Sequence, residues 1–530
     1  MERQRQGQRR DGGGSGPPRG PGSLIAAEGS ISLAKGIKNA TRYRPYLVKG
    51  ANWLGDAVMS LPAMAALAKA GVPMRVLSRS GAFGVYEHLP MVGGMVLEEK
   101  GFAGRVKTIV KLLNQRYSGA LLLTNSFSSA LIALASLIPD RTGFSRDFRS
   151  LMLSRAVRIM PADLLVHQSF YSLRLVEALG IPAPFVRPSL APKRPPEPAF
   201  GLGEGFKLAL APGAAYGGAK RWPAQSFAKA AKDILASRPG TAVILGGPNE
   251  TGAAKAVEEA LAGGPRVVNL AGQTTLTEAI SVLAKCHLTL SNDSGLMHLS
   301  GALDVPVVAV FGPTDPMITA PLSRRYAILR NPVDCAPCLK RECPRGRRIC
   351  LDDLEPSLAS EAAGKLLSPF QTGRGALFWS DPKGVSLPKA PLPNDMRLVM
   401  VEGVKSPGDE AGAERESASE EENIAQSTAE AGKPEKTPAP PGALILPRPE
   451  RGEIDWQKFI KDHKINPASS FWLGDEKESL APAAKLGGRS ILVMTERAIG
   501  KIADWRQEMV PDLTAPSALK AFEWLWAMLS

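Results

Sequence analysis

The sequence contains no run of eighteen consecutive apolar residues, so we expect no part of it to span a membrane. Its start, residues 1–23, is basic without an apolar core, which excludes a secretory signal peptide. Cysteine is scarce: there are five, four of them clustered between Cys335 and Cys350, and this is unlike the disulfide framework of a secreted protein. We therefore expect a cytoplasmic protein.

Two common nucleotide-binding motifs are also missing. The loop after the first predicted strand lacks the GxGxxG dinucleotide fingerprint, and no GxxxxGK[ST] phosphate loop is present. The basic segments lack interleaved aromatic residues, so we expect no nucleic-acid partner. A net charge of +14 favours a phosphate-rich substrate or an acidic membrane surface, unless it only keeps the protein soluble.

The length of 530 residues is too great for one ordinary core, and a hydrophobic content of 44% is that of a globular protein. A basic tail rich in Gly, Pro and Arg (1–42) and an acidic linker (402–450) are expected to be disordered. The proline-rich stretch Pro182–Pro198 is typical of a stiff linker. We therefore predict α/β domains at 43–190 and 191–370, and a third domain made of 371–401 and 451–530.

The stretch Leu288–Pro316 has the pattern of a βαβ unit: strand, polar turn, short helix and a buried parallel strand. Asp293, Ser294 and Gly295 would open the helix at the carboxyl edge of the sheet, and His298 follows one turn later on the same face. A helix N-terminus there suits a phosphate group. The alternative is that the polar residues merely cap the helix.

The first predicted unit begins with the strand Tyr46–Lys49, a Gly-containing loop and a helix that carries Val58, Leu61, Met64 and Leu67 at core spacing. Asp56 lies where the loop meets the helix, again at the functional edge of a sheet. It is either a functional carboxylate or a helix cap. Further strands are predicted at Met74–Leu77, Met95–Leu97, Ala120–Leu123 and Val157–Ile159.

The second unit starts with the strand Lys207–Ala211, which runs into a glycine-rich loop ending in Lys220-Arg221. Backbone N–H groups of such a loop and two cations can bind an anion, although a mobile basic surface turn has the same composition. Strands at Ala242–Leu245 and Val267–Leu270 follow, and the Leu288–Pro316 stretch is expected to complete this sheet.

Several motifs in this order resemble the heptosyltransferases of glycosyltransferase family 9, most of all their heptosyltransferase II type. The resemblance covers about residues 45–370, and it rests on NWLGDAVMSLPA, PGAAYGGAKRWP, GGPNE, NLAGQTTLTEAISVLA and SNDSGLMHLSGALDVPVVAVFGPTDP. It implies an α/β protein of the GT-B fold, with two Rossmann-like domains and the active site between them.

The resemblance also implies roles for individual residues. By motif position, Asp56 is the general base and Lys220 neutralises the diphosphate leaving group. Glu250 would accept hydrogen bonds from the nucleotide ribose. The remaining donor-binding candidates line the phosphates or the diphospho-sugar: Ala214, Ala215, Tyr216, Asp293, Ser294, Gly295 and His298.

The implied activity is inverting transfer of heptose from ADP-L-glycero-D-manno-heptose to the lipopolysaccharide inner core. One displacement of a good leaving group needs a base, charge neutralisation and positioning, so the motifs require no metal or other cofactor. The implied acceptor is lipid A–core, and the protein is expected to contact the cytoplasmic face of the inner membrane peripherally. The alternatives are a bifunctional transferase and heptose-phosphate phosphatase, or a non-catalytic sugar-nucleotide-binding protein.

Four cysteines, Cys335, Cys338, Cys343 and Cys350, have the spacing CxxC-x4-C-x6-C, which permits a structural zinc site. The alternative is a set of reduced thiols that pack an irregular loop. Basic residues between them, which we expect to face the phosphorylated acceptor, are Lys340, Arg341, Arg345, Arg347 and Arg348.

The third domain resembles the haloacid dehalogenase phosphatases, notably the heptose-bisphosphate type. The match rests on ALFWSDPKGV, with Asp381 in the DxDG position, and on FWLGDEKESL, with Asp475 in the late metal-binding motif. Lys383 stands where the acid/base aspartate belongs, and a Mg²⁺ phosphatase needs that carboxylate. We therefore predict a degenerate HAD-like domain without phosphatase activity.

Overall fold

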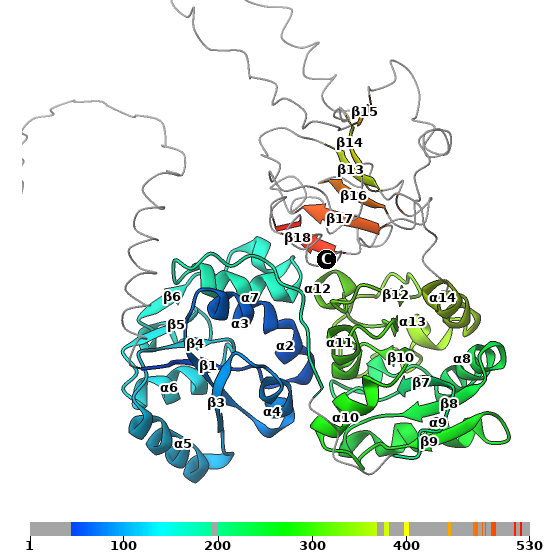
Figure 1. Ribbon diagram of the computed structural model, residues 1–530, viewed down its shortest axis with the longest axis horizontal. Coiled ribbons are helices and arrows are strands. Elements are labelled where there is room, and N and C mark those ends of the chain that lie inside the picture. The colour runs from blue at the N-terminus through cyan, green and yellow to red at the C-terminus, as the bar shows by residue number, and fades with distance from the viewer. Residues whose placement is uncertain are drawn as a thin grey trace, which may run out of the picture.

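The computed structural model describes residues 44–192 and 200–367, together with the strands and a few single residues of the C-terminal region. Three parallel six-stranded sheets lie in it, one after another along the chain (Figure 1). Each has the strand order 3-2-1-4-5-6 within its own unit. In such a sheet the first and fourth strands are neighbours, and the crevice at their carboxyl ends is where ligands bind.

The first sheet has the order β3-β2-β1-β4-β5-β6. Its strands are β1 (Tyr46–Lys49), β2 (Met74–Ser78), β3 (Val92–Leu97), β4 (Gly119–Leu122), β5 (Asp140–Phe144) and β6 (Arg155–Val157). Its helices are α2 (Leu54–Met59), α3 (Leu61–Lys69), α4 (Ser80–Glu87), α5 (Gly101–Gln115), α6 (Phe127–Ala135) and α7 (Gln168–Glu177), with short 3-10 turns η1 (Ser150–Met152) and η2 (Pro161–Leu164).

The second sheet has the order β12-β11-β10-β7-β8-β9. Its strands are β7 (Phe206–Ala211), β8 (Gly240–Ile244), β9 (Arg266–Asn269), β10 (Leu288–Asn292), β11 (Val307–Val310) and β12 (Tyr326–Leu329). Its helices are α8 (Ala224–Ser237), α9 (Thr251–Leu261), α10 (Leu276–Leu283), α11 (Gly295–Ala302), α12 (Pro316–Thr319), α13 (Ile349–Asp352) and α14 (Ser357–Leu367), with 3-10 turns η3 (Gly218–Lys220) and η4 (Pro248–Glu250).

The predicted βαβ unit of the second sheet is confirmed. Every residue of β10 and β11 is buried, as expected for parallel strands covered by helices on both faces. Ser294 occupies the N-cap position and α11 begins at Gly295. The two Rossmann-like sheets of the predicted fold class are therefore present.

Three expectations about the elements were wrong. The helix after Asp56 is interrupted at Ser60, because Pro62 has no N–H to donate to the carbonyl of Val58; α2 ends there and α3 begins. Strand β5 was missed because its sequence, DRTGF, has polar residues where apolar ones give the strand signal. The second sheet does not end with Phe311, since β12 adds an edge strand beyond it.

The two domains meet through α2 and α11, each of which has a glycine at the closest approach. A Cβ on Gly55 would lie 2.9 Å from the His298 ring, and one on Gly295 would lie 2.7 Å from the Leu54 Cβ. The His167 side chain adds a hydrogen bond across the interface, from Nε2 to the carbonyl of Ala320 at 2.9 Å. The helix that carries Asp56 is thus packed directly against the helix that follows Asp293.

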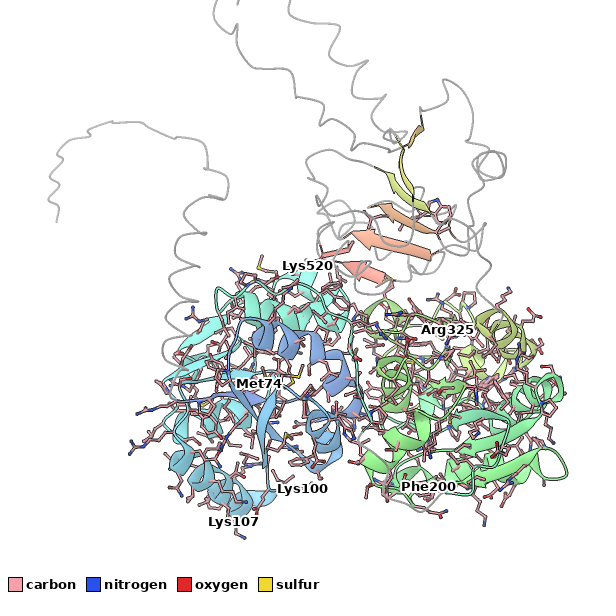
Figure 2. All side chains as sticks on the ribbon, viewed as in Figure 1. Met74, Lys100, Lys107, Phe200, Arg325 and Lys520 are labelled. Carbon is pink, nitrogen blue, oxygen red and sulfur yellow. The ribbon has the colours of Figure 1, made fainter. Side chains whose placement is uncertain are left out.

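The third sheet has the order β15-β14-β13-β16-β17-β18. Its strands are β13 (Ala376–Ser380), β14 (Arg397–Val401), β15 (Leu444–Leu446), β16 (Phe471–Gly474), β17 (Arg489–Val493) and β18 (Leu513–Ala515). Lys520 of this region is labelled in Figure 2. It donates a hydrogen bond to the carbonyl of Ala183 and pairs with Glu177 at 2.9 Å. The residues that decide the phosphatase resemblance, Asp381, Lys383 and Asp475, lie outside the described residues, so the HAD-like assignment stays a prediction.

Candidate active site

A cavity of about 590 Å³ opens between the two domains at the carboxyl ends of β1, β7 and β10. This volume is in the range of small-molecule and cofactor sites. The N-terminal domain contributes α2 and the start of α4, and the C-terminal domain contributes the loops after β7, β8 and β10. Predicted site residues that line it are Asp56, Ala215, Tyr216, Lys220, Glu250, Asp293, Ser294, Gly295 and His298.

Asp56 lies in the first turn of α2 and is open to the cavity. The helix is capped at Trp53 without a side-chain hydrogen bond, so Asp56 does not act as the N-cap. Burial within the cleft raises the pKa of Asp56 above that of an ordinary aspartate; Lys220 lowers it and Asp293 raises it further. A carboxylate in this position is a better proton acceptor than one in water.

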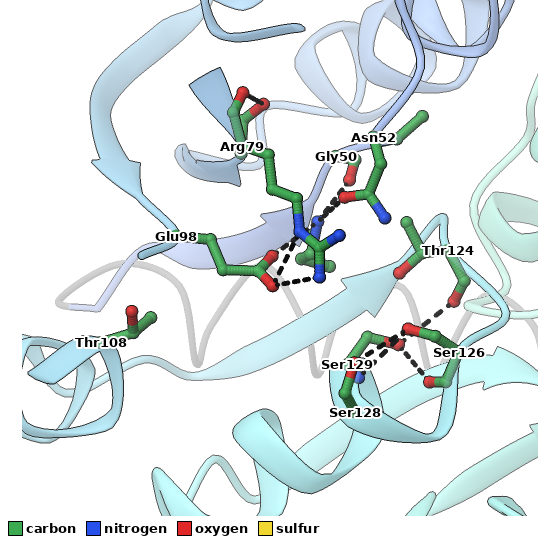
Figure 3. A network of polar contacts seen from close by, with 12 residues as sticks. Gly50, Asn52, Arg79, Glu98, Thr108, Thr124, Ser126, Ser128 and Ser129 are labelled. Carbon is green, nitrogen blue, oxygen red and sulfur yellow. Dashed lines mark hydrogen bonds and ion pairs between the residues drawn. The ribbon is translucent and has the colours of Figure 1, made fainter. Parts of the chain in front are cut away.

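The loop that leads into α2 is braced by a buried polar cluster (Figure 3). The Lys49 ammonium donates to the carbonyl of Gly50 at 2.7 Å and to Asn52 Oδ1 at 3.1 Å, and it pairs with Glu98 at 3.1 Å. Glu98 also accepts two hydrogen bonds from Arg79. Burial lowers the pKa of Lys49, and Glu98 acts against that shift. The sequence pattern indicated only a strand residue at Lys49 and missed this brace.

Lys220 forms a short ion pair with Asp293, 2.6 Å from Nζ to Oδ2. Asp293 is 5% exposed and its Oδ2 also accepts a hydrogen bond from Thr314 at 2.6 Å. The Lys220 ammonium lies 4.9 Å from the centre of the Tyr216 ring, within cation–π distance. The loop after β7 and the turn after β10 are therefore tied together by charge, at the switch point of the sheet.

The side chains of the turn Asn292–Ser294 do not cap α11. Asn292 accepts a hydrogen bond from the Trp222 N–H at 3.0 Å and donates to the carbonyl of Pro212 at 2.8 Å. The Ser294 hydroxyl lies 3.1 Å from the hydroxyl of Ser291 and makes no cap hydrogen bond. The capping alternative is thus wrong, and no side chain of the turn occupies the first-turn N–H groups of α11, which border the cavity.

His298 projects from the first turn of α11 against Gly55, and its Nδ1 is buried without a hydrogen-bond partner. Burial lowers the pKa of His298 to about 4, with Asp293 acting against the shift. The imidazole is therefore neutral near pH 7. It can donate or accept one hydrogen bond toward a ligand in the cavity.

Of the other predicted residues, Glu250, Ala215 and Tyr216 line the cavity and Ala214 does not. Glu250 accepts a hydrogen bond from the Gly247 N–H at 2.8 Å and packs over Gly213, where a Cβ would lie 2.4 Å from its carboxyl carbon. Ala215 and Tyr216 face the cavity. Ala214 is 1% exposed and does not line it, because the loop turns outward only after that residue.

Sequence reasoning missed part of the cavity wall. Thr274, Thr275 and Leu276 line the cavity at the start of α10, and Trp53 lines it from the other domain. Thr275 is held as a helix N-cap by a reciprocal pair of hydrogen bonds with Glu278. The motif NLAGQTTLTEAISVLA contained these residues, and its T-x-x-E capping box was the signal that marked the helix start.

Comparison with known proteins shows which family the chain belongs to. The sequence model of glycosyltransferase family 9 (heptosyltransferase) matches residues 105–348. Lipopolysaccharide heptosyltransferase 2 of Salmonella typhimurium is 32% identical over 348 residues, which cover 61% of this chain and 98% of that protein. The chain belongs to glycosyltransferase family 9. The corresponding Escherichia coli K12 protein is 31% identical over 347 residues, 61% of this chain and 98% of its own length.

Solved structures of the same glycosyltransferase family agree. The Escherichia coli ADP-heptose LPS heptosyltransferase II structure aligns with a TM-score of 0.52 at 28% identity, covering 61% of this chain and 98% of that one. A family 9 glycosyltransferase from Veillonella parvula shares the fold, with a TM-score of 0.52 at 20% identity. Within the described part of this glycosyltransferase, no helix is both long enough and apolar enough to cross a bilayer.

The cysteine cluster of this glycosyltransferase lies next to the site, behind the loop that carries Lys220. Cys335, Cys338, Cys343 and Cys350 line one small cavity of about 40 Å³. Burial raises the pKa of the Cys350 thiol to about 11, and the other three cysteines raise it further. Among the described residues no three or more His, Cys, Asp or Glu side chains are grouped to hold a metal ion.

The basic residues between these cysteines do not all face outward, as the sequence suggested. Arg348 donates hydrogen bonds to two carbonyls of the loop that carries Lys220, at Gly218 and Arg221. The backbone carbonyl of Arg341 accepts from the Ala219 N–H at 3.0 Å. The Arg348 side chain is therefore directed at the donor side of the site, and the Arg341 guanidinium lies 5.3 Å from the centre of the Tyr216 ring.

Proposed function

We propose that the chain transfers heptose from ADP-L-glycero-D-manno-heptose to the lipopolysaccharide inner core, with inversion at the anomeric carbon. One observation carries the proposal: Asp56 from the first domain and the Lys220–Asp293 pair from the second line the same cavity. A carboxylate base on one wall and a cation with a helix N-terminus on the other are what a single displacement of a diphosphate needs.

Asp56 would act as the general base. Its raised pKa makes the carboxylate a stronger acceptor for the proton of the acceptor hydroxyl. The hydroxyl oxygen then bonds to the anomeric carbon as the bond from that carbon to the ADP oxygen breaks. The electron pair of the broken bond leaves with ADP, so atoms and charges balance without a covalent enzyme intermediate.

The departing diphosphate would meet Lys220 and the first turn of α11. The ammonium has three donors, one of which is directed at Asp293, and the helix dipole adds a partial positive charge. Glu250, near the Gly246-Gly247 turn after β8, would accept hydrogen bonds from the nucleotide ribose; its place in the cavity wall supports this role. The proposed chemistry uses these groups and needs no further cofactor.

The proposed acceptor is lipid A–core at the cytoplasmic face of the inner membrane. Support comes from the net charge of +14, which attracts a phosphorylated acceptor and an anionic surface, and from the names of the relatives. A structural zinc in the cysteine cluster is a separate proposal. About one zinc per chain in protein purified without chelators supports it, and metal-free protein of equal stability contradicts it.

The direct test is to incubate the purified full-length protein with ADP-heptose and a panel of truncated core acceptors, and to measure ADP release and the anomeric configuration of the product. Acceptor-dependent ADP release with inversion supports the proposal. ADP-heptose binding without transfer to any acceptor would favour the non-catalytic alternative.

A further inference from the structure

The cysteine segment, residues 335–350, contacts the second half of the donor loop, residues 212–221. The Tyr216 hydroxyl donates to the carbonyl of Leu339 at 2.8 Å, and the Gly218 N–H donates to the Glu342 carboxylate at 3.2 Å. A Cβ on Gly217 would lie 2.3 Å from the Arg341 carbonyl oxygen, so only glycine allows this approach. The two segments are thus packed backbone to backbone.

Arg348 forms hydrogen bonds with the backbone before and after Lys220. Its Nη1 donates to the carbonyl of Gly218 at 3.1 Å and to that of Arg221 at 2.6 Å. Gly218 begins η3, and Arg221 directly follows Lys220 at its end. A single planar guanidinium therefore fixes the turn from which the Lys220 side chain projects. Lys220 itself bonds to Asp293, which follows the neighbouring strand β10, and has no contact with Arg348 among the described hydrogen bonds.

Arg348 is in turn held by the Asp352 carboxylate. Asp352, at the end of α13, accepts from Arg348 Nη2 at 2.9 Å and from the Arg348 backbone N–H at 2.8 Å. The Arg348 side chain is 28% exposed, and it lines the same small cavity as the four cysteines and Ala219. The cysteine cluster, the guanidinium and the donor loop form one continuous packed unit.

We infer that the cysteine segment positions the donor loop, and that Arg348 is a positioning residue for the diphosphate contact of Lys220. The inference rests on the proposed function, because it takes the loop to be the diphosphate site. Arg348 acts through the backbone of η3 and does not itself touch the donor. Its loss should therefore weaken recognition of the diphosphate without affecting the nucleoside.

The test measures binding of ADP and of adenosine to the full-length protein by calorimetry, for wild type, Arg348→Ala, Arg348→Lys and Lys220→Ala. Arg348→Ala should weaken ADP about tenfold and leave adenosine nearly unchanged, and Arg348→Lys, which keeps one donor, should fall between. The matched control is Arg105→Ala, which removes an exposed guanidinium on α5 of the other domain. It should bind ADP as wild type does.

The double variant Arg348→Ala/Lys220→Ala distinguishes positioning from an independent contact. If Arg348 acts through Lys220, the double variant binds ADP no more weakly than Lys220→Ala alone. Additive losses, or equal losses for ADP and adenosine, would overturn the inference while leaving the proposed donor intact. A wild-type protein that binds no ADP would overturn the proposed donor, and the inference with it.

Discussion

The Lys220 ammonium lies 2.6 Å from the Asp293 carboxylate, although the two residues are 73 positions apart in the chain. Lys220 follows β7 and Asp293 follows β10, which are neighbours only because the strand order reverses between them. The pair therefore marks the switch point of the second sheet. It also fixes the distance between the donor loop and the helix that begins at Gly295.

Replacing Lys220 with alanine should weaken ADP-heptose and ADP binding ten- to about a hundredfold. A charge-assisted contact is worth about 1.5–3 kcal/mol, and the variant would also leave the Asp293 carboxylate facing the phosphates without its cation. Adenosine has no phosphate and should lose less. Lys255→Ala, on the surface of α9, is the control and should change neither affinity. Equal losses of affinity for ADP and adenosine would show that Lys220 only supports the fold.

Replacing Gly295 with alanine should lower turnover by at least tenfold. The new Cβ would lie 2.7 Å from the Leu54 Cβ, so α2 must move and carry Asp56 away from the cavity wall. Displacements of about 1 Å can cost a hundredfold in rate. Gly252→Ala, on α9 where a Cβ meets open space, is the matched control and should retain full activity. Wild-type turnover in Gly295→Ala would show that the α2–α11 contact is not critical.

The buried His167 should make the protein acid-sensitive. Burial lowers its pKa to about 4, with the hydrogen bond to Ala320 acting against the shift, and Nδ1 accepts from the Ser169 N–H. Because the folded pKa lies below the unfolded value of 6.5, the stabilisation is complete above pH 6.5 and is lost as pH falls toward 4. At one pKa unit per about 1.4 kcal/mol, the loss is roughly 3 kcal/mol.

The measurement for His167 is the free energy of unfolding between pH 7 and pH 4, for wild type and His167→Gln. The variant should be less stable at pH 7 and should show a shallower decline with acid. Parallel curves for the two proteins would contradict the assignment of this slope to His167.

Sequence reasoning recovered the parts of the site whose geometry follows from parallel sheets. Asp56 and Lys220 lie at the ends of loops that follow predicted strands, Asp293 lies in the turn after another, and the carboxyl ends of such strands share one edge. It failed where contacts come from residues far along the chain or from an irregular segment. No local pattern predicts that Arg348 reaches the carbonyl of Gly218, 130 residues away, or that Lys49 is buried beside Glu98.

A proline within a helical run and a polar strand account for two of the errors in the fold. Ser60 ends α2 because of a single proline, and β5 forms from a polar sequence because its neighbours supply the hydrogen-bonding partners. The apolar strands β10 and β11 were found because burial on both faces leaves a continuous hydrophobic signal.

The central claim, that Asp56 is the base of an inverting heptose transfer, is tested most directly by the turnover of Asp56→Asn over a pH series. The account predicts unchanged ADP-heptose affinity, a turnover at least about a hundredfold lower, and loss of the acidic limb that wild type shows as pH falls through the raised pKa of Asp56. Asp233→Asn, on the exposed face of α8, should behave as wild type. Near-normal turnover of Asp56→Asn with an unchanged pH profile would contradict the account.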